Sequence, residues 1–70
     1  MNKFYNIRSQ LCRDMKNVLD KYHIPYEEIT DVEQIVNDGI LSVPTLKWED
    51  GETDNFKTIT QRLNGEEHNF

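Results

Sequence analysis

Cysteine is nearly absent from this sequence, because Cys12 is the single one among 70 residues. One thiol cannot close an intramolecular disulfide, whereas small secreted domains usually depend on several. Residues Met1–Ile7 hold no long apolar core of a signal peptide, and nowhere do eighteen apolar residues follow one another. We therefore expect a soluble cytoplasmic protein and exclude a disulfide-stabilised scaffold.

Positive charge is also scarce. Thirteen acidic residues against eight basic ones give a net charge of -5. Phosphate backbones and anionic lipids repel such a surface, so we expect neither nucleic acid nor a membrane as partner. No proline-, glycine- or serine-rich linker divides the chain, and a domain of this size buries only about 60% of its unfolded surface. The sequence predicts one small domain that is a monomer.

The clearest periodic pattern is that of an amphipathic helix. Ser9 stands at its start as an N-cap, and Pro25 disfavours helical geometry at Ile24, so the helix should end near His23. Before it, Lys3–Ile7 is typical of a short strand. The apolar residues with helical spacing are Leu11, Met15, Val18, Leu19 and Tyr22.

A second strand and a second helix follow. Pro25–Ile29 predicts the strand, and Thr30 with Glu33 forms a candidate capping box for a short helix that stops at Gly39. We expect this helix to turn its apolar residues inward, namely Val32, Ile35 and Val36.

The last third of the chain predicts a hairpin and a helix. Ile40–Trp48 is strand-like, with Pro44 at its beginning or on an edge. Asp50-Gly51 is a strong hairpin turn, and Glu52–Asn55 is the return strand. A final helix carries Phe56, Ile59 and Leu63 on one face and is closed by Asn64-Gly65. We expect a single domain over 1–65 and a frayed tail over 66–70.

The resulting order is β-α-β-α-β-β-α. A parallel crossover followed by an antiparallel hairpin predicts a four-stranded mixed sheet with helices on both faces. A two-helix ferredoxin-like arrangement is the competing topology, but it leaves one predicted helix unplaced.

Three segments together resemble glutaredoxins. Cys12–Ile29 is similar to the first helix and second strand of that family. Ser42–Leu46 resembles its Thr-Val-Pro segment, in which the proline is cis and faces the active site. Asp50-Gly51 and Phe56 match its hairpin and last helix, so the resemblance covers Phe4 to Leu63. It implies a thioredoxin-like fold and a thiol-disulfide role in cell redox homeostasis.

The active-site motif departs from that family. Where glutaredoxins have Cys-X-X-Cys, this chain has Ser9-Gln10-Leu11-Cys12. The resemblance puts Ser9 at the nucleophile's position and Cys12 at the resolving one. A serine hydroxyl cannot form a disulfide, and it needs a base to become a nucleophile at neutral pH. The motif therefore predicts at most monothiol exchange through Cys12.

The resemblance also implies a binding groove. In it, the backbone of Val43 beside cis-Pro44 would meet an extended substrate such as glutathione or a protein thiol or disulfide. Arg8 is the candidate for the family's basic residue, and Asp54 for its glutathione-binding turn. The histidines and Cys12 are too scattered for a zinc site, so we expect no metal and no cofactor.

Two classes of function stay open at this point. The first is thiol-disulfide exchange by Cys12 near a helix N-terminus, and the second is a redox-inactive module that binds a peptide or protein beside Pro44. A third alternative, self-assembly, predicts an apolar exposed sheet edge. Exposure of the Cys12 sulfur separates the first two, because an exposed sulfur favours exchange and a buried one favours binding.

Overall fold

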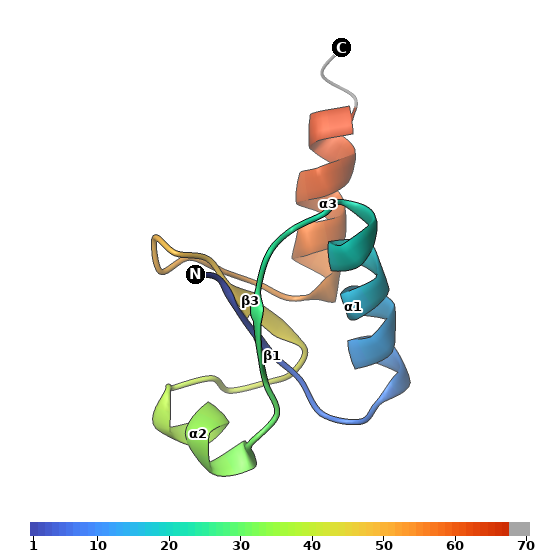
Figure 1. Ribbon diagram of the computed structural model, residues 1–70. Helices are drawn as coiled ribbons and strands as arrows, with labels where there is room; N and C mark the ends of the chain where they lie inside the picture. The colour runs from blue at the N-terminus through green and yellow to red at the C-terminus, as the bar shows by residue number, and fades with distance from the viewer. Residues whose placement is uncertain (68–70) are drawn as a thin grey trace.

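Four short strands form one mixed sheet in the order β2-β1-β3-β4 (Figure 1). In the computed structural model, which describes residues 1–67, β1 runs parallel to β2 and antiparallel to β3, and β3 is antiparallel to β4. The predicted parallel crossover and antiparallel hairpin are thus confirmed. The strands are β1 (Lys3–Tyr5), β2 (Glu27–Ile29), β3 (Thr45–Lys47) and β4 (Thr53–Asp54).

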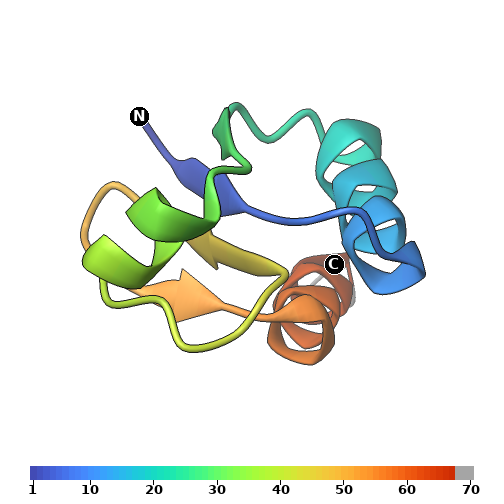
Figure 2. The same cartoon turned by 90° about the horizontal axis from the view of Figure 1, so that it is seen from below.

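Three helices cover the two faces of this sheet. The helices are α1 (Gln10–Lys21), α2 (Val32–Asn37) and α3 (Phe56–Glu67). Figure 2 shows α1 and α3 together on one side of the strands and α2 on the other. The protein is therefore an α/β domain with the predicted order of elements and with helices on both faces.

Both ends of α1 follow from local hydrogen bonding. The Oγ of Ser9 accepts a hydrogen bond from the Cys12 amide at 3.2 Å, which confirms the predicted N-cap. At the other end His23 has a φ of 56°, in the left-handed region, and the Ile24 amide donates to the Leu19 carbonyl at 3.0 Å. This is a Schellman ending, and it stops the helix where the sequence predicted.

The larger core lies between the sheet and the helix pair α1 and α3. Its side chains are nearly inaccessible to solvent, and Val18, Tyr22, Trp48 and others pack around them. The buried residues of this face are Phe4, Met15, Leu19, Leu46, Ile59 and Leu63.

The smaller core lies under α2. It consists of Tyr5, Ile29 and Ile35. Of the three α2 residues predicted to turn inward only Ile35 does so, because Val32 and Val36 are 63% and 66% exposed. The prediction was wrong since a helix of six residues has less than two turns and presents a single position to the sheet.

Other boundaries also differ from the sequence prediction, since β1, β2 and β4 are each shorter than the strand predicted there. The strand expected over Ile40–Trp48 is reduced to β3, which begins directly after Pro44, since proline has no amide to donate to a ladder. The N-cap of α2 is Asp31 and not Thr30; its side chain accepts from the Glu33 amide at 3.2 Å.

The last helix also extends beyond its predicted end. α3 continues through the expected stop at Asn64-Gly65 and reaches Glu67, so the first two residues of the predicted tail are helical. The rest of that tail, 68–70, lies outside the described residues.

Candidate functional site

The two predicted groove residues, Val43 and Pro44, lie in a groove of about 390 Å³. It is bounded by the first turn of α1, the loop before β3 and the first turn of α3. The peptide bond between Val43 and Pro44 is cis, as the resemblance implied. The other residues that line this Pro44 groove are Leu11, Ser42, Asn55, Phe56 and Lys57.

Val43, one of the residues that line this groove, has an unpaired main chain in the described part of the structure. Val43 precedes β3 and is not part of the sheet ladder. In the part of the chain that the structure describes, its amide and carbonyl groups make no hydrogen bond. Its side chain is half-buried, whereas Pro44 is buried. The groove is thus lined by a residue with an unpaired peptide group and by apolar neighbours.

The N-terminus of α3 forms the polar side of the groove. Asn55 caps it: its Oδ1 accepts from the Thr58 amide at 2.9 Å, and the Thr58 Oγ1 accepts from the Asn55 amide at 2.8 Å. This reciprocal pair keeps the first turn of α3 in place. Lys57 is exposed beside it, so the helix dipole and an ammonium group give this side of the groove a positive character.

Cys12 does not reach the groove. Its side chain is 2% exposed, and its Sγ lies 3.5 Å from the Ile7 amide, which donates to it. Ser9 is half-buried, and its hydroxyl is engaged as the N-cap of α1. Neither residue is among those that line the Pro44 groove.

Arg8 and Asp54, the other two candidates for glutathione recognition, also lie apart from the groove lining. Arg8 is exposed. Asp54 is buried and held by partners of its own: Oδ2 accepts from Trp48 Nε1 at 2.6 Å and lies 3.0 Å from Arg62 Nε. A hydrogen bond to Glu52 and the charge of Asp54 raise the pKa of Arg62. The Asp54 carboxylate thus links the edge strand β4 to α3 through Arg62.

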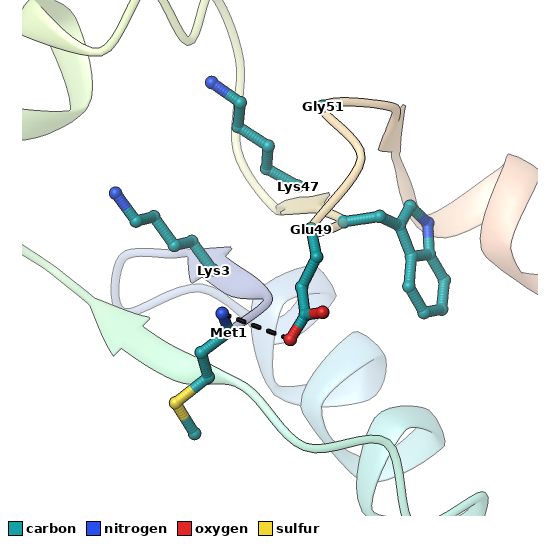
Figure 3. A pocket seen from close by; sticks show the side chains of 6 residues that line it. Met1, Lys3, Lys47, Glu49 and Gly51 are labelled. Carbon is teal, nitrogen blue, oxygen red and sulfur yellow. Dashed lines mark ion pairs between the residues drawn. The ribbon is translucent and has the colours of Figure 1, made fainter.

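A second cavity, of about 350 Å³, lies at the opposite end of β3. Figure 3 shows the amino group of Met1 in an ion pair with Glu49, at 3.1 Å, while Lys3 and Lys47 extend away from that pair. Lys3 and Lys47 are directly opposite each other on β1 and β3. None of the site residues predicted from the sequence lines this cavity.

Three residues of the Pro44 groove were missed from the sequence as binding residues. Phe56 was interpreted only as a core position of the last helix, Ser42 was noted only as part of the Ser42–Leu46 segment, and Lys57 was given no role. A usable signal was present, because Phe56-Lys57 opens a helix directly after the return strand. Residues at a helix N-terminus lie beside the carboxyl end of the preceding segment and are well placed to meet a ligand.

Residues 1–67 hold neither a cluster of metal ligands nor a membrane-spanning helix. In that range no three histidine, cysteine or acidic side chains gather as metal ligands would. No helix there combines the length and the apolar character needed to cross a bilayer. Comparisons with protein-family models, with curated proteins and with solved structures found no match to this chain.

Proposed function

We propose that this chain is a thioredoxin-like domain of the glutaredoxin type that serves as a binding module, with an extended segment of a protein partner held in the Pro44 groove. The element order, the strand order β2-β1-β3-β4 and the proline directly before β3 support the fold. A single thiol without a disulfide suits a reducing compartment, so a cytoplasmic location belongs to the same proposal.

The observation that carries this function is the unpaired main chain of Val43 inside an apolar groove. An extended peptide can pair its own backbone with such a group, as in the addition of a strand to a sheet edge. The side chains of Leu11 and Phe56 lie on either side and provide apolar contact. Hydrogen bonds between the two backbones would supply the affinity. The side chains of Leu11 and Phe56 would determine which side chains of the peptide fit the groove.

The positive side of the groove favours a partner with a carboxylate. Lys57 and the N-terminus of α3 can both attract an anionic group. Glutathione is a small extended peptide with two carboxylates, and it is therefore a suitable first probe. A protein segment that ends in, or contains, an acidic residue meets the same requirement.

The test is a titration of the isotope-labelled protein with reduced glutathione and, separately, with a blocked peptide of alternating valine and threonine, followed by amide NMR shifts. We expect shifts at Leu11, Val43 and Lys57. Leu11→Gln should weaken binding about tenfold, whereas Leu41→Gln, at an exposed leucine outside the groove, should not. Shifts confined to other regions, or equal affinities of both variants, would contradict the proposal.

Thiol exchange through Cys12 is the second candidate. The observation that favours it is the position of the sulfur, in the first turn of α1 with the Ile7 amide directed at it. In that reaction the Cys12 thiolate would attack glutathione disulfide, form a mixed disulfide and release one glutathione. Mass spectrometry of native protein incubated with glutathione disulfide measures it. Because the side chain is 2% exposed, we expect adducts only under unfolding conditions; rapid adduct formation in the native state would favour exchange instead.

A further inference from the structure

A cluster of apolar side chains on the α2 side of the molecule is open to solvent. Six large apolar side chains are exposed in the described part of the chain, and four of them belong to this cluster. Leu41 is 99% exposed, the largest exposed fraction among these six side chains. We define the α2 surface as Ile7, Val32, Val36, Ile40, Leu41 and Val43, which line a cavity of about 260 Å³.

This surface exists because α2 is too short to bury its own apolar residues. Ile35 faces the sheet, and the neighbouring valines are left outside. After the Gly39 ending, the chain runs as a loop to Pro44 and lifts Leu41 away from the core. Since Ser42 and Val43 line both cavities, the α2 surface is adjacent to the Pro44 groove; its other residues come from α2 and from the segments around it, not from α1 or α3.

The charged residues next to the α2 surface are mostly acidic. Between Lys21 and Lys47 the chain carries five acidic residues and no lysine or arginine. Two of the five have partners elsewhere, because Glu28 pairs with Lys16 of α1 and Asp38 accepts from the Tyr5 hydroxyl. Asp31 and Glu33 bracket Val32 on α2, and in residues 1–67 neither forms an ion pair. The nearest basic residue along the chain is Arg8, which is exposed beside Ile7. An apolar centre with an acidic rim selects a partner whose apolar centre has a basic rim.

We infer that the α2 surface docks a protein segment in which aliphatic side chains are flanked by lysine or arginine. A second copy of this chain is a poor occupant, because two acidic rims would repel each other. An anionic lipid surface is disfavoured for the same reason. This inference does not depend on the Pro44 groove, and the two can fail separately.

The probes are three blocked peptides of about twelve residues. The first has leucines at helical spacing with lysines between them; the second has glutamates for the lysines; the third has serines for the leucines. Each is titrated into labelled protein, and we expect the first to shift the amides of residues 32–36 and 40–43. Its affinity should exceed that of the other two by about tenfold or more and should fall as salt is raised.

Variants of the α2 surface and of the Pro44 groove show which of the two sites binds the basic peptide. Val36→Gln and Leu41→Gln should each weaken binding of the basic peptide about tenfold, while Leu11→Gln in the Pro44 groove should leave it unchanged. Glu33→Lys should shift the preference toward the glutamate peptide. These side chains are exposed, so urea unfolding midpoints should match that of the parent protein.

Three results would overturn the inference. They are equal affinity for the basic and acidic peptides, shifts that map outside the α2 surface, and a mass in sedimentation that rises with protein concentration in the parent but not in Val36→Gln. The last result would assign the surface to a second copy of the chain.

Discussion

The two faces of the sheet differ in how completely their helices cover them. On the α1/α3 face, two helices of twelve residues bury a cluster of six side chains around Phe4 and Leu46. On the α2 face, one helix of six residues buries three around Tyr5, and its neighbours remain in solvent. The difference comes from helix length, because each extra turn adds about one position that can face the sheet.

Because of this asymmetry, we expect the α1/α3 face to contribute most of the folding stability and the α2 face to be the one available for binding. Burial of apolar area is the main favourable term in folding, so most of the stability should reside on the α1/α3 face. The α2 face keeps apolar side chains that contribute little until a partner covers them. The Pro44 groove lies where the two faces meet, at the loop that joins α2 to β3.

The largest effect should come from truncating the core of each face in turn. Leu19→Ala removes a fully buried side chain from the α1/α3 face and should cost toward the upper end of about 2–5 kcal/mol, enough to threaten folding. Ile35→Ala, where the parent side chain is 6% exposed, should cost toward the lower end because the sparser surroundings can collapse. Urea unfolding followed by circular dichroism measures both. Equal costs would remove the distinction between the faces.

A smaller effect is expected at the polar contact that closes the α1/α3 face. Asp54→Ala leaves Trp48 Nε1 and Arg62 Nε without their acceptor and should cost about 1–3 kcal/mol. Asp54→Asn is the matched control, since its amide oxygen can still accept from the indole, and it should cost less. The same variants bear on the groove: if Asp54→Asn abolished glutathione binding without loss of stability, this carboxylate would have a direct role in recognition.

Most of the fold could be predicted from sequence because its periodic signals are local. The apolar stripe of α1, the Ser9 cap and the Gly39 stop each depend on neighbouring residues. The cap and the stop hold, and the stripe holds except at Leu11, which is 48% exposed. The strand predicted from Ile40 failed because alternation of apolar residues cannot show whether a partner strand is present. The inward valines of α2 failed for a related reason, as the number of positions facing a sheet depends on helix length.

The candidate site was predictable only in part. Val43 and Pro44 were found because the resemblance supplied a short motif. Asp54 was singled out by its position before the last helix, but nothing local indicated that Trp48 and Arg62 would occupy its carboxylate. The groove is completed by residues of α1 and of the start of α3, and the two helices are more than thirty residues apart in sequence. Such a meeting depends on tertiary packing, which periodicity does not encode.

The smallest expected effect is a loss of stability at alkaline pH. It involves one tyrosine on each face of the sheet. Tyr5, on the α2 face, donates to Asp38 at 2.7 Å; burial, and then this hydrogen bond, raise its pKa to about 12. Tyr26, against the α1/α3 core, donates to Asp20 at 2.9 Å, and the same causes raise its pKa to about 12. Each phenol keeps its proton in the folded state after the unfolded chain has begun to lose it.

The stability that each tyrosine contributes is therefore complete below about pH 10 and is lost as pH rises through about 12. Urea midpoints at about pH 9 and about pH 11.5 should show a decline in the parent protein that is reduced in both Tyr5→Phe and Tyr26→Phe. Because Asp38 is the C-cap of α2, a decline that disappears only in Tyr5→Phe would identify the α2 face as the one that opens first. Absorbance of tyrosinate in the same samples checks the premise, since titration of both residues near pH 10 would show that neither hydroxyl is held as described.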